Sequence, residues 1–195
     1  MASCAKMASC ARWHLALRLN QSSGGNPMAD EIIQLLKERF PEAIVEVPEG
    51  VKDPAVVVRK ESIVEVARFL RDEVGFNYLS FMSGMDYPER FEVVYYLYSM
   101  GREPLKENLG PFVLKVYVED KENPSVPTVS HIWLAAFQQE QEIYDMFGIR
   151  FEGHPDLRRI FMWEGFPGWP LRKDFENRTY TYKELEPTRP KPPYW

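Results

Sequence analysis

Three apolar segments of strand-like length follow one another in the middle of the chain. They occupy about residues 78–85, 91–99 and 112–118. The first two are joined by Asp86-Tyr-Pro-Glu89, a run of turn-forming residues that predicts an antiparallel hairpin. Hairpin-linked strands do not form a doubly wound parallel sheet, so this feature directs the chain toward an α+β arrangement.

The elements before these strands support the same fold class. A helix is predicted over 30–40 and a short strand over 43–47, followed by a β-branched strand over 55–58. Apolar residues at helical spacing predict a second helix over 61–74. With one further helix after the three strands, the order is α-β2-α-β3-α. It predicts an α+β fold with a mixed β-sheet, helices on one face, and an extended irregular C-terminal strap.

The helix after the strands is predicted over 131–147. Thr128 or Ser130 would cap its N-terminus, and Gly148 would end it. The preceding Asn123-Pro-Ser-Val-Pro127 is expected to be a rigid connector, because its two prolines restrict the backbone.

The chain divides by composition into residues 1–27, 28–149 and 150–195. The first part has three basic residues and no acidic residue, and it ends in Ser22-Ser-Gly-Gly-Asn-Pro27. We expect a disordered leader or tail, or an extension upstream of Met28 as the working initiator. A mitochondrial transit peptide is the alternative, because such peptides are basic and poor in acidic residues.

The second part is an acidic domain, with 12 lysines and arginines against 22 aspartates and glutamates. An acidic surface is unsuited to nucleic acids, whose phosphates need a basic face. No apolar run approaches the roughly 20 residues that span a bilayer. Neither a P-loop nor a Gly-x-Gly-x-x-Gly motif occurs, so the usual phosphate cradle of nucleotide-binding proteins is missing.

Metal-ligating residues are few. Both cysteines, Cys4 and Cys10, lie in the first ten residues, which excludes a disulfide framework and a cysteine-ligated zinc or iron–sulfur site in the body of the chain. The three histidines, His14, His131 and His154, are widely scattered. We therefore expect no metal bound by this chain.

The third part combines ten aromatic residues with seven prolines and shows no clean periodicity. Such a segment cannot build a core of its own, yet it is too apolar for a solvated tail. Aromatic residues and arginine dominate the energetics of protein interfaces. We therefore expect residues 150–195 to be a strap that lies on the domain or on a fixed assembly partner.

Candidate catalytic groups are weak. Glu140 falls in the middle of the apolar face of the predicted helix, and a buried carboxylate needs a partner. We expect that partner to be an arginine, such as Arg158 or Arg159. Glu142 is two residues away and points to another helix face, so the two acids do not form an acid–base pair.

His154 stands in the sequence Gly153-His-Pro-Asp156. A general base needs an orienting carboxylate, and Asp156 is close in sequence. The competing interpretation is a turn histidine packed beside Pro155, and we favour it. No catalytic residue is therefore assigned.

The sequence from Glu140 to Ile160, Glu-Gln-Glu-Ile-Tyr-Asp-Met-Phe-Gly-Ile-Arg-Phe-Glu-Gly-His-Pro-Asp-Leu-Arg-Arg-Ile, closely resembles a family signature. The family is the 30-kDa subunit, also called the C subunit, of proton-pumping NADH:quinone oxidoreductase (respiratory complex I). The segments 168–175, 86–95 and 124–127 match the same family. The resemblance covers roughly residues 30–180 and agrees with the α+β order.

The resemblance implies a subunit that binds no cofactor and has no activity alone. It would lie in the hydrophilic arm against the large 49-kDa-type subunit (the D subunit), close to where electrons reach quinone, with its strap along that partner. NADH with FMN, iron–sulfur clusters and quinone would be used by the whole complex. The chain would be peripheral to the inner membrane on the cytoplasmic side, or on the matrix side in mitochondria, and would meet the membrane only through the complex.

The resemblance also implies which positions anchor the helix, shape the turn or contact partners. They are Glu140, Glu142, Asp145, Phe147, Gly148, Gly153, His154, Pro155, Asp156, Arg158, Arg159, Trp169, Pro170, Leu171, Arg172, Lys173 and Asp174. Two positions depart from the family pattern, which usually has an aromatic at Gln138 and an arginine at Gln141. The homologous subunits of membrane-bound [NiFe]-hydrogenases and of ferredoxin- or F420H2-fed complex I relatives are the alternative.

Overall fold

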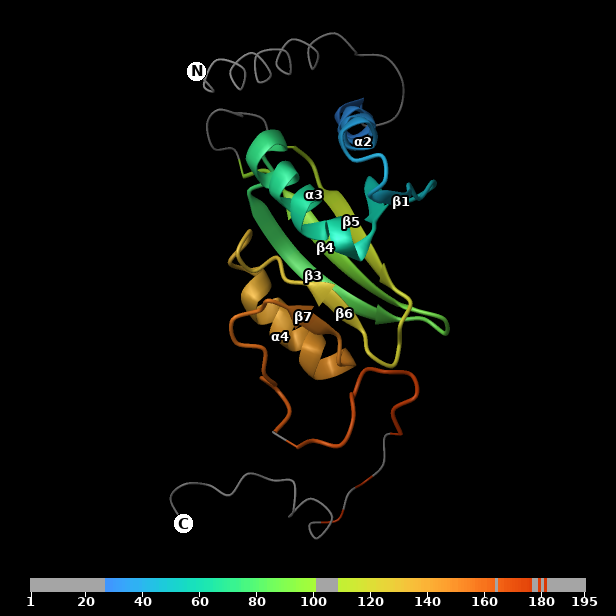
Figure 1. Ribbon diagram of the computed structural model, residues 1–195, viewed down its shortest axis with the longest axis vertical. Coiled ribbons are helices and arrows are strands. Elements are labelled where there is room, and N and C mark those ends of the chain that lie inside the picture. Colours follow the sequence, from blue (N-terminus) through green and yellow to red (C-terminus); the bar gives the residue numbers. More distant parts are fainter. Residues whose placement is uncertain (1–26, 101–108, 164, 177–178, 180, 182–195) are drawn as a thin grey trace.

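The computed structural model describes residues 27–100, 109–163, 165–176, 179 and 181. The predictions for the leader and for the proline-rich end of the chain fall almost entirely outside these ranges. Within them the fold is α+β, with one five-stranded sheet, one two-stranded sheet and three α-helices (Figure 1). The predicted fold class is confirmed.

The five-stranded sheet has the strand order β1-β2-β5-β4-β3. Its strands are β1 (Ile44–Glu46), β2 (Ala55–Val58), β3 (Tyr78–Asp86), β4 (Phe91–Tyr98) and β5 (Phe112–Val118). The last three pair antiparallel, as the hairpin sequence predicted. β2 instead runs parallel to β5, because the chain passes through a helix, β3 and β4 before it returns beside β2. This pairing makes the sheet mixed.

Three α-helices cover one face of this sheet. They are α2 (Pro27–Arg39), α3 (Ile63–Phe69) and α4 (Ala136–Phe147). Ile32, Ile63 and Ile143, one from each helix, share a single apolar core with the inward-facing strand residues. α3 continues as a π-turn over Leu70–Val74 and ends at Gly75, whose φ of 103° is easily adopted only by glycine.

α4 lies close against β3, the edge strand of the sheet. Gly84 makes this approach possible, since a Cβ atom there would come within 2.8 Å of the Phe147 ring. The side-chain oxygen of Gln139 accepts a hydrogen bond from the Met82 N–H on this edge. The helix thus covers the sheet edge and partners an N–H that no further strand would reach.

The prediction of a connector over 123–127 is wrong in part. Residues Ser125–Pro127 form a strand, β6, which pairs in parallel with β7 (Arg150–Glu152). Phe151 in β7 is buried, so the packed domain includes the first residues after α4. Strands of three residues carry too little periodicity to be recognised in a sequence.

The start of α4 also differs from the prediction. The helix begins at Ala136, and residues 128–135 form turns and irregular backbone. No side chain caps this helix, and the Thr128 hydroxyl is hydrogen-bonded to Glu140. The residue that was expected to cap the helix is therefore hydrogen-bonded to a buried carboxyl group instead.

Candidate partner-binding site

The signature from Glu140 to Ile160 covers most of α4, the strand β7 and the turn that follows it. The chain continues from β7 through the turn at 153–156 into residues 157–175, which we call the strap segment. Its course passes below α4 in Figure 1. It contains no helix or strand in its described residues, so its position depends on side-chain and backbone contacts with the domain.

Asp145 holds the first part of the strap segment. Its carboxylate is fully buried and accepts hydrogen bonds from the N–H groups of Ile160, Phe161 and Met162, at 3.0, 2.7 and 2.9 Å. The Arg159 guanidinium lies 3.1 Å from the other carboxylate oxygen. Three backbone donors and one cation compensate the cost of burying this charge. Residues 159–162 are therefore fixed to α4.

Asp86 holds the second part from the end of β3. One carboxylate oxygen accepts the Lys173 N–H at 2.8 Å, and the other is 2.6 Å from the Lys121 ammonium. Burial alone would raise the pKa of Asp86, but the hydrogen bonds from Lys121 and Lys173 outweigh it and lower the pKa below its ordinary value. The carboxylate thus stays ionised and binds the strap segment at neutral pH.

Trp169 and Arg172 fill the space between these two anchors. The Trp169 indole covers Gly148, where a Cβ atom would overlap the ring, and it packs on Tyr144. Arg159 stacks on the same indole at 4.2 Å. Arg172 donates to the Phe147 carbonyl at 2.5 Å and lies over the Phe91 ring. The strap segment is therefore held against the domain near both of its ends.

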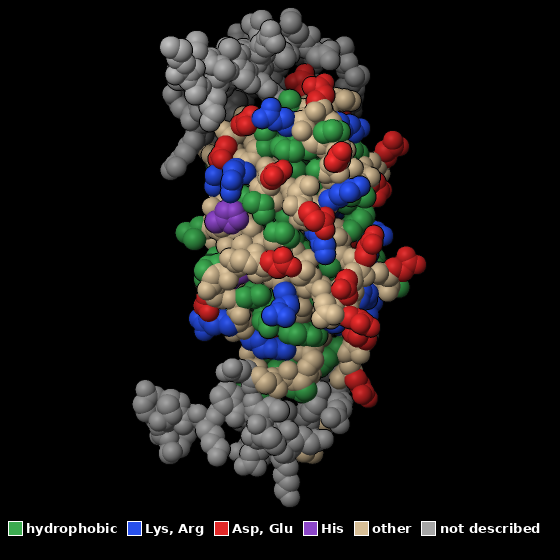
Figure 2. Space-filling view, in the orientation of Figure 1, with side chains coloured by type: hydrophobic (Ala, Val, Ile, Leu, Met, Phe, Trp, Pro, Cys, Tyr) green, Lys and Arg blue, Asp and Glu red, His purple; other side chains and the backbone are tan. Residues whose placement is uncertain are grey.

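Large apolar side chains of the strap segment nevertheless point into solvent. Phe161 is 62% exposed and Leu171 is 55% exposed. Ile160, whose N–H binds Asp145, also has an exposed side chain. At this lower end of the described surface, Figure 2 shows apolar and basic side chains close together. Fixed apolar side chains that remain exposed are typical of a protein-binding surface.

The expected pairing of Glu140 with an arginine is wrong. Arg158 is exposed and pairs with Asp156, while Arg159 pairs with Asp145. The Glu140 carboxyl is 0% exposed and is hydrogen-bonded to the Val129 N–H and the Thr128 hydroxyl. These partners lie 11 and 12 residues before it, in a segment whose fold the sequence did not reveal.

The side chain of His154 is buried in the turn at 153–156. Its Nδ1 accepts the Asp156 N–H at 3.0 Å, and its Nε2 donates to the Phe137 carbonyl at 3.0 Å. The Asp156 carboxylate faces Arg158 and does not orient the imidazole. A histidine with both nitrogens occupied and no exposed side-chain surface is not arranged as a general base.

The remaining signature positions divide between packing and surface. Gln141, where the family usually has arginine, is buried and donates to the Asp156 carbonyl at 2.6 Å. Gln138 and Glu142 are exposed on α4. Gly148 and Gly153 adopt positive φ angles of 73° and 81°. The Gln141 side chain therefore links the turn at 153–156 to α4.

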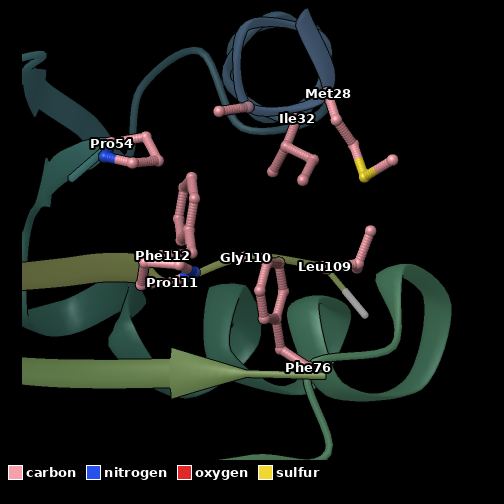
Figure 3. A pocket seen from close by; sticks show the side chains of 9 residues that line it. Met28, Ile32, Pro54, Phe76, Leu109, Gly110, Pro111 and Phe112 are labelled. Carbon is pink, nitrogen blue, oxygen red and sulfur yellow. The ribbon is translucent and has the colours of Figure 1, made fainter. Parts of the chain in front are cut away.

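The described residues contain no cluster of three or more histidine, cysteine, aspartate or glutamate side chains that would hold a metal ion. A small hollow between α2 and the start of β5 is lined by apolar residues such as Ile32, Phe76 and Leu109 (Figure 3). Its lining presents no side chain that could carry out acid–base or nucleophilic chemistry. The anchored strap segment is thus the strongest candidate site.

Sequence reasoning missed the tertiary contacts of two residues, one at this site and one beside Glu140. Asp86 was interpreted only as the start of a turn, although it binds Lys173, 87 residues later. Thr128 was interpreted as a helix cap. Local patterns contain no information on such distant partners, but an aspartate that ends a buried strand is a signal worth testing.

Known proteins share both the sequence pattern and the fold. The family described as "Respiratory-chain NADH dehydrogenase, 30 Kd subunit" matches residues 56–181. The chain belongs to this family. The matched range of the 30-kDa subunit family includes most of the sheet, α4 and the whole strap segment. The resemblance inferred from the signature is confirmed.

Curated members of the 30-kDa subunit family cover most of the chain. The C 2 subunit of the NADH-quinone oxidoreductase of Rhizobium meliloti is 50% identical over 137 aligned positions, and the match covers 66% of this chain and 69% of that protein. The C subunit of the NADH-quinone oxidoreductase of Moorella thermoacetica is 41% identical over 152 residues, which are 77% of this chain and 97% of that protein.

A solved structure shares the fold of this 30-kDa subunit family member. A chain in the membrane-bound sulfane sulfur reductase, an archaeal respiratory membrane complex, superimposes with a TM-score of 0.61 at 24% identity. The match covers 76% of this chain and 85% of that chain. At this identity the likeness concerns the fold alone.

Proposed function

We propose that this chain is a structural and assembly subunit of the hydrophilic arm of a complex I-like NADH:quinone oxidoreductase. It docks on the large 49-kDa-type subunit near the quinone-reducing end and supports electron transfer that is coupled to proton translocation. Its family and the names of its relatives support this role. NADH, FMN, iron–sulfur clusters and quinone are then used by the whole complex, and this chain supplies no catalytic group.

The observation that carries the proposal is the anchored strap segment. Asp145 and Asp86 fix it to the domain at two points, so Phe161 and Leu171 are presented in defined positions. Binding by an already ordered surface avoids the entropy cost of ordering a flexible segment. The side chains exposed on the strap segment are therefore the proposed contacts with the 49-kDa-type subunit.

The proposed location is peripheral, on the cytoplasmic side of the inner membrane or on the matrix side in mitochondria. No helix among the described residues is long and apolar enough to cross a bilayer. Attachment to the membrane then occurs through the other subunits of the complex.

Co-purification with the 49-kDa-type subunit tests the proposal. We expect Phe161→Asp and Leu171→Asp to reduce the amount of that subunit recovered with the chain at least about tenfold, because each places a charge in an apolar contact. Leu134→Asp is the matched control, since Leu134 is 85% exposed and lies outside the strap segment. It should co-purify normally.

Two results would contradict the proposed docking surface. One is normal co-purification of both strap variants. The other is an equal loss in the Leu134 control, which would indicate a general effect of added charge. Capture of a large subunit with four nickel-ligating cysteines would instead favour the hydrogenase-type alternative.

A further inference from the structure

Glu140 occupies a second polar site, separate from the exposed side chains of the strap segment. Its side chain lies in the interior beside α4 and is fully buried. Within the described part of the chain, no lysine or arginine forms an ion pair with it. A carboxyl group in such surroundings is costly to ionise. It therefore favours the protonated form, and exchange of its proton needs a path to solvent.

A chain of oxygen atoms leads from this carboxyl toward the surface. One carboxyl oxygen of Glu140 is 2.5 Å from the Thr128 hydroxyl, and the other accepts the Val129 N–H at 2.8 Å. The Thr128 hydroxyl is in turn 2.8 Å from the Ser130 hydroxyl. Ser130 is half-buried, so this series of oxygen atoms ends at a residue that is partly exposed to solvent.

The hydrogen bonds between these hydroxyls can run in either of two directions. When Glu140 is protonated, it donates to Thr128, and Thr128 donates to Ser130. When Glu140 is ionised, Ser130 donates to Thr128, and Thr128 donates to the carboxylate. In both arrangements each hydroxyl donates its one hydrogen and accepts at its lone pairs. Reversing the direction of these hydrogen bonds therefore leaves neither hydroxyl without a partner.

Two other titratable groups face Glu140, and both have other surroundings to satisfy. His154 Nε2 lies 3.9 Å from the carboxyl but donates to the Phe137 carbonyl, and Nδ1 already accepts the Asp156 N–H. Tyr95, from β4, is neutral, and burial together with the charge of Glu140 raises its pKa well above the ordinary value.

We propose that Glu140 is a buried proton-binding site, which exchanges its proton with solvent through the hydroxyls of Thr128 and Ser130. The bound proton lets the carboxyl group hold residues 128–130 against α4 without an unpaired charge. Loss of the proton leaves an uncompensated charge in the interior, which destabilises the fold. Burial supports the proposal, since it raises the pKa of Glu140 to about 7 although the hydrogen bonds from Thr128 and Val129 act to lower it.

Nuclear magnetic resonance of the full chain tests the site directly. The Val129 amide is hydrogen-bonded to Glu140, so we expect its chemical shift to change with pH, with a midpoint near 7. Glu140→Gln should abolish this transition. Glu142→Gln is the matched control, because Glu142 lies on the same helix and is exposed, and the transition should persist.

The hydroxyl chain has a test of its own. Thr128→Val removes the hydrogen bond that lowers the pKa of Glu140, so the midpoint should rise by about one pH unit. Thr128→Ser keeps the hydroxyl and should keep the midpoint. An unchanged midpoint in Thr128→Val would overturn the role of this residue.

Two further outcomes would overturn the proposal as a whole. One is a Val129 transition that persists in Glu140→Gln or that coincides with charging of the His154 ring. The other needs no variant: in wild-type protein labelled with ¹³C at the glutamate carboxyls, no carboxyl resonance titrates near neutral pH. The second measurement decides the matter even if Glu140→Gln does not fold.

Discussion

Two buried carboxyl groups of α4, only five positions apart, are satisfied in different ways. Asp145 receives three backbone N–H groups and a guanidinium. Glu140 receives one backbone N–H and one hydroxyl and faces no cation among the described residues. The burial of Asp145 is therefore compensated by these partners, whereas Glu140 is stable in the interior when it holds a proton. Substitution of each residue should have a different consequence.

Glu140→Gln should reduce the pH dependence of stability. The folded-state pKa of about 7 lies above the ordinary value of 4.5, so ionisation destabilises the fold increasingly as pH rises from the lower value to the higher one. Glutamine has the same shape and no charge. In chemical denaturation, the free energy of unfolding of the variant relative to wild type should improve by about 2–3 kcal/mol between about pH 5 and pH 8. Parallel pH profiles would contradict this expectation.

Asp145→Asn should release the first part of the strap segment. The amide group turns donors toward N–H groups that need acceptors, and the ion pair with Arg159 is lost. We expect hydrogen exchange at the amides of 160–162 to accelerate and the free energy of unfolding to fall by about 2–4 kcal/mol. Glu142→Gln, an exposed neighbour on α4, should change neither quantity. Unchanged exchange at 160–162 in Asp145→Asn would mean that this carboxylate is not the anchor.

At the scale of elements, the end of α4 depends on one glycine. Gly148 has a φ of 73° and lies beneath the Trp169 indole. The left-handed conformation ends the helix, and the missing side chain lets the strap segment pass close to it. The helix terminus and the strap segment are thus a single packing unit.

Gly148→Ala should therefore displace Trp169 as well as strain the backbone. The added Cβ atom would overlap the indole ring, so we expect a red shift of tryptophan fluorescence together with a loss of stability. In a Trp169→Ala background the clash is gone, and Gly148→Ala should cost only the left-handed penalty of about 1–2 kcal/mol. Equal costs in both backgrounds would show that Trp169 does not depend on this glycine.

The elements that the sequence predicted well are those with long, regular patterns. Strands β3, β4 and β5 and helix α2 appear close to their expected bounds. The two three-residue strands β6 and β7 were missed because their pairing joins segments about 25 residues apart. The start of α4 was misplaced because the Thr128 hydroxyl is hydrogen-bonded to Glu140 and does not cap the helix. This is a tertiary contact, whereas helix-capping patterns describe local contacts only.

At the scale of the whole molecule, we expect the apolar core to fold without most of the strap segment. Members of the apolar core extend along the chain to Phe151, with Leu157 packed against them. A chain that ends after Arg158 should therefore keep its circular dichroism spectrum and unfold cooperatively, but fail to co-purify with the 49-kDa-type subunit. Loss of the folded spectrum would contradict this expectation.

The sequence predicted which segments form the site, but it did not predict the contacts that hold them together. The signature resemblance identified α4, the turn and the strap, and composition indicated that the strap needs a surface to lie on. The pairs that fix it, Asp145 with 160–162 and Asp86 with Lys173, join residues that no local pattern relates. Predicting them requires the sheet topology that places the end of β3 beside the end of α4.

The contact between Asp86 and Lys173 also has a consequence for how the protein is made. The acceptor is synthesised 87 residues before its donor, so a ribosome must translate nearly the whole domain before the contact can form. Until then Asp86 and Asp145 lack the backbone donors that later bind them. The strap segment is thus synthesised after the domain on which it lies, and the surface proposed for the 49-kDa-type subunit is completed only after the core beneath it has been made.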